Sequence, residues 1–215
     1  MHLFRLDASV RTTGSVSRAL ADTAEQAWLA EHPGATVTRR DIGLEPLPSD
    51  LWAKAARSAV DPTAPKAPEA AEVTATLAAE LLDADAYVFA VPLYNWGVPA
   101  SFKTWIDLVL LNQRFGGGGD RPLAGRPAVL AMSRGGGYGP GTPKHGWDHN
   151  GPYVQRVLAE VLHLDVHVAE AELTLADVTP AMESLRGMAA DLLKTGHEHA
   201  AKHGRTIADL VGPRA

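Results

Sequence analysis

The stretch that decides the fold is Ala86-Tyr87-Val88-Phe89-Ala90-Val91-Pro92-Leu93-Tyr94-Asn95-Trp96-Gly97-Val98-Pro99. Its first half is continuously apolar, which is typical of a strand buried on both faces between two helix layers. Its second half is a turn rich in proline, glycine and asparagine, and a helical pattern restarts at Ala100. Small ligands bind at the carboxyl ends of such strands in open α/β sheets. We therefore expect a ligand-binding turn here.

Strand-like and helix-like segments alternate along the rest of the chain, which indicates βαβ units and a parallel sheet. Besides the strand that begins at Ala86, strands are predicted at residues 2–7, 35–42, 127–132 and 166–170. Helices are predicted from about Gly14 to Leu29 and at 69–82, 100–111, 152–162 and 180–203. The polar pattern of 35–42 is typical of an edge strand. Five strands with interleaved helices predict a doubly wound α/β domain with helices on both faces of the sheet.

One segment interrupts this alternation. Residues 45–68 contain five prolines and read mainly as a long excursion, with a short helix around Leu51–Lys54. Loops of this length in compact domains are usually functional or disordered.

The composition is that of an ordinary globular protein. The chain has 215 residues, of which 46% are hydrophobic and 21% charged, so one domain over residues 1–215 is expected. The net charge of −5 and the scattered Lys and Arg residues argue against a nucleic-acid partner. The sequence contains no cysteine, which excludes disulfides, thiolate catalysis and Cys-ligated metal centres.

The sequence also bears on location. The apolar segment within residues 1–7 is too short for a secretory signal, because charged residues interrupt it at Arg5 and Asp7. No apolar run reaches the roughly 18 residues that span a bilayer. We expect a soluble, cytoplasmic protein that does not bind membranes.

Three strand-to-helix corners carry unusual residues, and such corners meet at the carboxyl edge of a doubly wound sheet. The first corner combines Asp7-Ala8-Ser9 with Gly14-Ser15-Val16-Ser17 at a helix start, where N–H groups and the helix dipole favour an anion such as phosphate. Ser15 or Ser17 could equally be a simple N-cap. The glycine spacing matches neither a Rossmann fingerprint nor a P-loop.

The other two corners leave similar alternatives. In the second, Tyr94 and Trp96 flank the polar Asn95, whose amide can order the turn or meet a ligand; the rings could also be ordinary core aromatics. In the third, Ser133-Arg134-Gly135-Gly136-Gly137 lets backbone approach a ligand closely, or forms a flexible surface loop. Three such corners together favour a binding site.

These residues resemble the FMN-dependent NADH-azoreductase family, a branch of the flavodoxin-like quinone reductases. The matching pieces cover nearly the whole chain, and the Tyr-Asn turn followed by Lys-x-Trp-Ile-Asp is the most specific of them. They are Asp7-Ala8-Ser9, Ser15-Val16-Ser17-Arg18, Pro92-Leu93-Tyr94-Asn95-Trp96, Lys103-Thr104-Trp105-Ile106-Asp107 and Ser133-Arg134-Gly135-Gly136.

The resemblance implies a flavodoxin-like fold and one FMN per site. Ser9, Ser15, Val16 and Ser17 would surround its phosphate. The residues that would line the two edges of the flavin ring are Pro92, Leu93, Tyr94, Asn95, Trp96, Ser133, Arg134, Gly135 and Gly136. It further implies a homodimer whose two sites are shared between subunits.

The resemblance also implies the chemistry. NADH or NADPH would reduce FMN, which passes two electrons to a quinone, azo or nitroaromatic acceptor in ping-pong fashion. No catalytic acid or base is assigned, because the flavin itself carries out the hydride chemistry. Two alternative functions are also consistent with the sequence: a pathway-specific reductase of one aromatic metabolite, and a flavodoxin-like electron carrier.

Two aromatic residues are expected to contact the acceptor. Phe115 precedes the glycine-rich run 116–119, which we expect to be flexible and to cover the flavin, and Tyr138 follows the third corner. The segment 139–151 could shape the acceptor pocket. No metal site is expected, because the histidines near the end of the chain, such as His199 and His203, lack an acidic partner that completes a known pattern.

Overall fold

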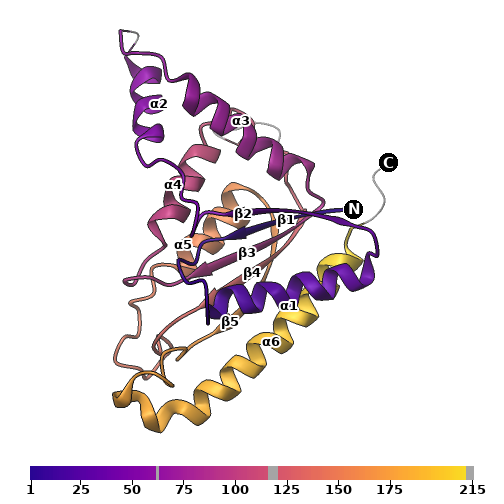
Figure 1. The fold of residues 1–215 in the computed structure, drawn as a ribbon, viewed down its shortest axis with the longest axis vertical. Coiled ribbons are helices and arrows are strands. Elements are labelled where there is room, and N and C mark those ends of the chain that lie inside the picture. The colour runs from indigo at the N-terminus through magenta and orange to yellow at the C-terminus, as the bar shows by residue number, and fades with distance from the viewer. Residues whose placement is uncertain (62, 116–120, 212–215) are drawn as a thin grey trace.

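A computed structural model describes residues 1–61, 63–115 and 121–211. Within that part of the chain, five parallel strands form one sheet in the order β2-β1-β3-β4-β5 (Figure 1). The strands are β1 (His2–Asp7), β2 (Thr36–Asp41), β3 (Ala86–Pro92), β4 (Pro127–Ser133) and β5 (Asp165–Ala171). This is the flavodoxin-like strand order, whose reversal between β1 and β3 is the place where a ligand binds. The predicted fold class is confirmed.

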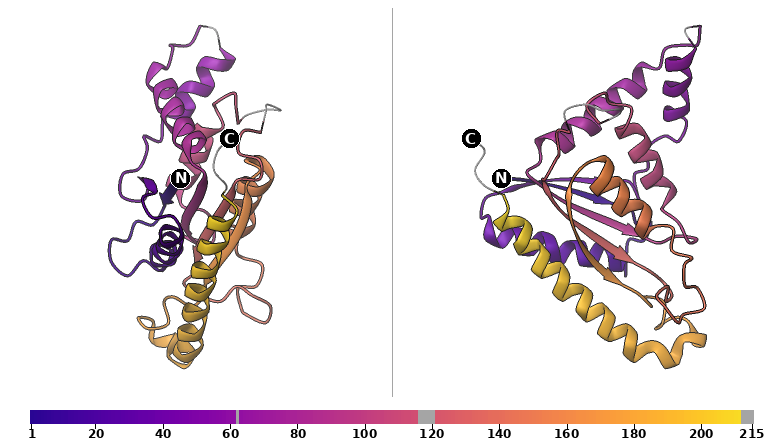
Figure 2. Two further views of the ribbon diagram at one scale, coloured as in Figure 1. Left: turned by 90° about the vertical axis from the view of Figure 1, so that its right-hand side faces the viewer. Right: turned by 180° about the vertical axis from the view of Figure 1, so that it is seen from behind.

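Helices cover both faces of the sheet. They are α1 (Val16–Glu31), α2 (Leu51–Val60), α3 (Pro68–Asp83), α4 (Ala100–Val109), α5 (Gly151–Arg156) and α6 (Arg186–Asp209). A π-helical turn (Val157–Val161) extends α5, and a 3-10 helix (Pro180–Leu185) precedes α6. Helices α1 and α6 lie together on one side of the sheet, as Figures 1 and 2 show.

The two faces of β3 differ in side-chain size, which sets how closely each helix layer approaches. Ala86, Val88 and Ala90 face the core formed with α1 and α6. Tyr87 and Phe89 alternate with them and enter the core formed with α3, α4 and α5, where Phe89 packs 6.0 Å from Trp105 between ring centroids. Every residue of β3 is buried, as expected of a strand covered on both sides.

The excursion at residues 45–68 is more helical than the sequence suggests. Instead of a short helix around Leu51–Lys54, α2 continues to Val60, because alanine-rich sequence sustains the helix until the next proline. Figure 1 shows α2 and the start of α3 standing clear of the sheet. Other boundaries also move, since α6 runs to Asp209 rather than ending near His203.

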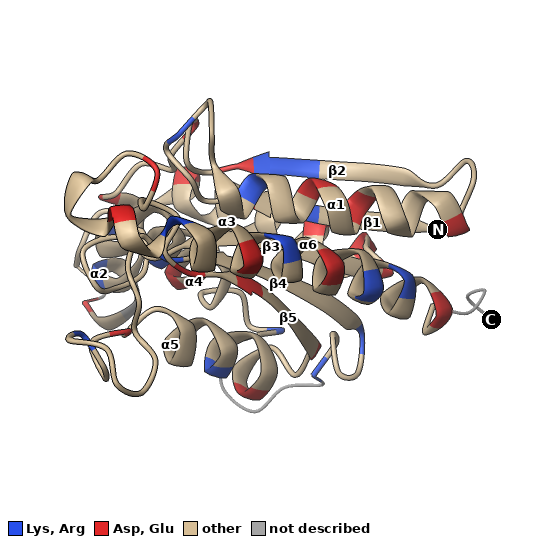
Figure 3. Cartoon of the chain, turned by 90° about the horizontal axis from the view of Figure 1, so that it is seen from below, with Lys and Arg blue, Asp and Glu red and all other residues tan. Residues whose placement is uncertain are grey.

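The charges do not gather by sign. Figure 3 shows acidic and basic residues interspersed along the helices on the side that it draws. Among the described residues, none of the helices is both long enough and apolar enough to cross a membrane. The same residues contain no group of three His, Asp or Glu side chains placed to hold a metal ion.

The contact between α1 and α6 depends on a glycine. A Cβ added at Gly204 would lie 2.3 Å from the carbonyl oxygen of Ala24 and 2.8 Å from the Cβ of Ala27. Because the closest neighbour is a backbone atom of α1 and the next is a Cβ, neither can move aside without shifting that helix.

We predict that Gly204→Ala lowers the free energy of unfolding by about 1–3 kcal/mol, the usual cost of overpacking. Thermal denaturation would show this as a drop of about 2–4 °C per kcal/mol. Gly187→Ala is the matched control in the same helix, because its Cβ would meet no described atom within 4 Å. That control should be at least as stable as the parent, because alanine has a higher helix propensity than glycine. A Gly204→Ala protein as stable as the parent would contradict the assignment.

Candidate functional site

Two adjoining cavities lie at the carboxyl edge of the sheet, where β1, β3 and β4 end side by side. The smaller has a volume of about 190 Å³ and the larger about 580 Å³. The smaller is lined by Ser9, Arg11, Ser15, Val16, Pro92, Leu93, Tyr94, Ser133, Gly135, Thr174 and Leu175. The larger is lined by Val10, Leu93, Tyr94, Asn95, Trp96, Gly135, Gly136, Tyr138, Lys144, Leu175, Thr179 and Met182. Four shared residues make them compartments of one site.

The smaller compartment has the chemistry of an anion site. Helix α1 begins there behind Ser15, and in the described structure that N-cap side chain makes no capping hydrogen bond, so the first N–H groups of the helix lack a side-chain partner. The hydroxyl oxygens of Ser15 and Ser17 lie 3.5 Å apart beside them. The helix dipole and the cationic Arg11 add positive potential. A phosphate fits this set of donors.

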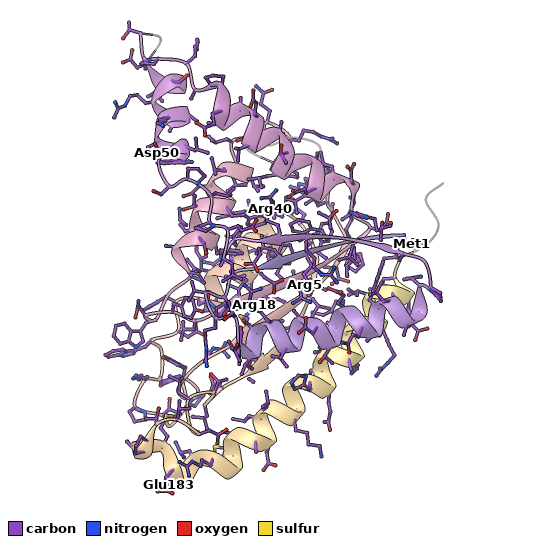
Figure 4. All side chains as sticks on the ribbon, viewed as in Figure 1. Met1, Arg5, Arg18, Arg40, Asp50 and Glu183 are labelled. Atoms are coloured by element: carbon purple, nitrogen blue, oxygen red, sulfur yellow. The ribbon has the colours of Figure 1, made fainter. Side chains whose placement is uncertain are left out.

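A buried ion network holds this first corner in place. The Arg5 guanidinium binds both carboxylate oxygens of Asp7 at 3.0 Å and reaches Glu25 of α1 at 3.1 Å. Figure 4 places Arg5 and Arg18 between β1 and α1. The network fixes the angle at which the chain leaves β1 and enters α1.

Arg18 extends this support to the loop itself. Its guanidinium donates to the carbonyl oxygen of Ser9 at 2.6 Å and to the two carboxylate oxygens of Asp41 at 2.7 and 2.8 Å. The hydrogen bond to Asp41 raises the pKa of Arg18. Burial opposes ionisation of Asp41, but the bonds from Arg18 and from the N–H groups of Leu44 and Gly43 outweigh it and lower the pKa of Asp41. Both groups therefore stay charged.

The second corner is a two-residue hairpin. The N–H of Tyr94 donates to the Gly97 carbonyl at 3.1 Å, and the N–H of Gly97 returns a bond to Tyr94 at 2.9 Å. Asn95 and Trp96 have φ angles of 47° and 65°, as in a type I′ turn. Positive φ is common for asparagine and strained for tryptophan. The turn holds Trp96 half-exposed at the larger compartment.

Tyr94 joins the first two corners. Its hydroxyl accepts the N–H of Val10 at 3.2 Å and lies 3.1 Å from the Oγ of Ser9. Tyr94 therefore lines the cavities and also forms a crosslink between the loop after β1 and the loop after β3. Its ring forms part of both compartments.

The third corner packs against a loop that the sequence did not single out. A Cβ at Gly135 would lie 2.7 Å from the Cδ1 of Leu175, so a larger residue there would require the Leu175 side chain to shift. The N–H of Leu175 donates to the carbonyl of Gly135 at 3.2 Å, and the N–H of Leu173 donates to that of Gly136 at 3.3 Å. The segment after β5 thus forms a fourth wall.

Arg134, predicted to contact the cofactor, has its guanidinium engaged by carboxylates of the protein. Its side chain is buried: Nε lies 2.6 Å from Asp148 and Nη1 2.9 Å from Glu170, with Glu172 at 3.6 Å. Arg134 lines neither compartment among the residues described. A guanidinium surrounded by acidic groups is held by them, so its role is to fasten the third corner to β5 and to the segment around Asp148.

The two predicted acceptor contacts are placed differently. Tyr138 lines the larger compartment, and burial together with the charges of Asp148 and Glu172 raises its pKa. Phe115 is half-buried against the core under α3 and α4 and lines neither compartment of its own chain. The glycine run 116–119 lies outside the described residues.

Most of the predicted cofactor residues come together. Ser17 is fully buried behind Ser15, and the rest except Arg134 line a compartment. Sequence reasoning missed Val10, Arg11, Lys144, Thr174, Leu175, Thr179 and Met182. Arg11 could have been found, because it lies between the two serine clusters of the first corner. Thr174 to Met182 carry no glycine or aromatic signal, so their sequence did not mark them.

A family model described as flavodoxin-like fold matches residues 1–195. The chain belongs to the flavodoxin-like family. Within this family it is 36% identical over 213 residues to the FMN-dependent NADH:quinone oxidoreductase of Frankia casuarinae, covering 97% of this chain and 99% of that protein. The FMN-dependent NADH:quinone oxidoreductase of Kineococcus radiotolerans is 39% identical over 211 residues, at 96% and 99% coverage. These matches confirm the family resemblance indicated by the motifs.

Solved structures of other proteins share the fold. The FMN-dependent NADH-azoreductase from Bacillus anthracis, in complex with FMN, superimposes with a TM-score of 0.75 at 14% identity, covering 97% of this chain and 100% of that one. An NAD(P)H:quinone oxidoreductase from Methanothermobacter marburgensis gives a TM-score of 0.62 at 19% identity, covering 96% and 98%.

We predict that Tyr94→Phe weakens FMN binding about fivefold, the equivalent of one lost hydrogen bond of about 1 kcal/mol. Without the hydroxyl, the N–H of Val10 and the Oγ of Ser9 lose the partner that ties their loop to the turn. Fluorescence titration of the apoprotein with FMN measures the change. Tyr153→Phe, on α5, is the matched control and should bind FMN as the parent does. Equal affinity of Tyr94→Phe and the parent would show that the crosslink does not order the site.

Proposed function

We propose that this protein is an FMN-dependent NAD(P)H oxidoreductase that reduces quinones or azo compounds. The observation that carries the proposal is the junction of an anion-binding compartment with a wider aromatic one at the β1/β3 strand reversal. FMN has this shape and charge, with a phosphate at one end and a flat ring at the other. The relatives named FMN-dependent NADH:quinone oxidoreductase support it.

Each compartment has a distinct task in this proposal. The start of α1, with Ser9, Ser15 and Arg11, binds the phosphate. The turn at Tyr94 and the backbone of Gly135 and Gly136 orient the ring and exclude water from its edges. When bound, FMN supplies the two-electron chemistry between the nicotinamide donor and the acceptor.

The volume left in the larger compartment beside a bound flavin limits how the donor and the acceptor can bind. The larger compartment has a volume of about 580 Å³, part of which a flavin ring would occupy. Donor and acceptor would therefore use the same space in turn, which favours ping-pong kinetics over a ternary complex. The consumption of NADH also fits the cytoplasmic location expected from the sequence.

Anaerobic spectroscopy tests the proposal. We expect purified protein saturated with FMN to lose its flavin absorbance on addition of NADH or NADPH and to regain it on addition of a quinone. Initial rates at several quinone concentrations should give parallel double-reciprocal lines. Bleaching without turnover by any quinone, azo or nitroaromatic acceptor would favour an electron carrier, and FMN-loaded protein that oxidises neither nucleotide would refute the proposal.

We further infer that the protein is a homodimer whose sites are shared between subunits. An acceptor contact at Phe115 would require this arrangement, because the ring lies away from its own chain's compartments and could reach an acceptor only in a neighbouring copy. Helix α2 and the start of α3, which stand clear of the sheet, offer surface for such an association (Figure 1).

The dimer makes two measurable predictions. Light scattering during gel filtration should give twice the chain mass of 22.8 kDa. Phe115→Leu, which keeps an apolar side chain in the core, should lower kcat/KM for a quinone about fivefold, the equivalent of about 1 kcal/mol of aromatic contact. Its affinity for FMN should not change. A monomeric mass, or an unaltered kcat/KM, would contradict the shared site.

A further inference from the structure

One cation faces the larger compartment. Among the described residues that line it, Lys144 alone carries a charge; the others are apolar, aromatic, amide, hydroxyl or glycine residues. The molecule as a whole has a net charge of −5, so the charge of this lysine is opposite in sign to the net charge of the protein. The function proposed above gives this charge no task.

The segment that carries Lys144 is held by successive turns. The N–H and Oγ1 of Thr142 donate to the carbonyl of Gly139 at 3.2 and 2.8 Å. The N–H of His145 donates to Thr142 at 3.1 Å, and that of Trp147 donates to the carbonyl of Lys144 at 3.0 Å. Lys144 therefore extends from a folded loop, which limits where its ammonium group can reach.

The same segment is fastened to the second corner. The N–H of His149 donates to the carbonyl of Trp96 at 2.9 Å, and the rings of Trp96 and Trp147 meet edge to face with centroids 5.7 Å apart. The Nζ of Lys144 lies 5.9 Å from the centroid of the Trp96 ring, within the range of a cation–π contact. Trp96 thus sets the position of the cation from the turn that lines the compartment.

The charge of Lys144 is not neutralised by the protein. Among the described residues, no carboxylate lies within ion-pair distance of its Nζ. Asp148 and Glu172, whose charges act on Tyr138 of this compartment, both interact with the buried Arg134. A weak cation–π contact at an exposed site leaves the ammonium able to bind an anion.

We propose that Lys144 is a specificity residue that recognises an anionic substituent on the flat molecule bound in the larger compartment. This inference rests on the proposed function. The anion has two sources with the same chemistry: a sulfonate or carboxylate on an aromatic acceptor, or a phosphate of the nicotinamide donor. Lys144 adjoins Trp96 in the aromatic compartment, whereas the phosphate site around Arg11 lies in the smaller one, so the two cations serve different groups.

Kinetics with two acceptors test the proposal. The ratio of kcat/KM for 1,4-naphthoquinone-2-sulfonate to that for 1,4-naphthoquinone should fall about fivefold in Lys144→Gln, the effect of a partly exposed ion pair. Because each variant is compared with itself, the different potentials of the two quinones cancel. Lys144→Arg should keep the ratio, and so should Lys202→Gln, which removes an exposed charge from α6.

A second kinetic experiment tests the nicotinamide donor, with the neutral 1,4-naphthoquinone as the acceptor. If Lys144 serves the nicotinamide donor, Lys144→Gln should lower kcat/KM for NADH about fivefold while the ratio between the two quinones stays constant. High ionic strength should reduce whichever preference depends on Lys144 in the parent and leave Lys144→Gln unaffected. If neither the quinone ratio nor kcat/KM for NADH changes, the proposal is wrong.

A binding measurement separates this proposal from the proposed function. Calorimetry with naphthalene-2-sulfonate, which is not reduced, should give a Kd about fivefold higher for Lys144→Gln than for the parent or Lys202→Gln. Protein that binds the sulfonate through Lys144 but oxidises no nicotinamide would refute the oxidoreductase and keep the anion site. Sulfonate affinity that is the same in all variants would refute the anion site for acceptors, whatever the activity.

Discussion

The parallel pairing of β1 with β3 is the constraint on which the site depends. The two strands run side by side from Leu3 opposite Ala86 to Asp7 opposite Ala90, and the pairing ends where the N–H of Ala8 donates to the carbonyl of Ala90. From that point the chain leaves β1 toward α1 on one face and leaves β3 toward α4 on the other. Because the two connections diverge, a hollow opens at the carboxyl edge, and both compartments occupy it.

The site contains local conformations that are unfavourable in themselves and are stabilised by contacts around them. A helix start without a side-chain cap and a tryptophan at positive φ are both unfavourable by themselves. The surrounding contacts hold them in place: Arg18 bonds the loop after β1, Tyr94 links that loop to the next, and Arg134 fastens the third corner. Two of these three, the half-buried Arg18 and the buried Arg134, are guanidinium groups whose charge is balanced by carboxylates of neighbouring strands and loops.

Local sequence was sufficient for the sheet and for most of the site. The apolar run at 86–92 predicts a strand covered on both faces, and the polar pattern of β2 predicts an edge; both are confirmed. Serines after β1, the Tyr94–Trp96 turn after β3 and glycines after β4 marked three walls of the site, because such residues serve anion binding, ring contact and close backbone approach. The wall formed by Thr174 and Leu175 carries no such cue, and only packing against Gly135 makes it part of the site.

The sequence by itself determined the layers, the strand succession and the chemistry available at each corner, since burial and turn formation act over a few neighbouring residues. The tertiary structure decided what each side chain does there. It paired the Arg134 side chain with Asp148, made Tyr94 a crosslink, and brought Lys144 over the ring of Trp96. These outcomes depend on groups far apart in the chain, whose meeting is governed by the register and twist of the whole sheet rather than by any local pattern.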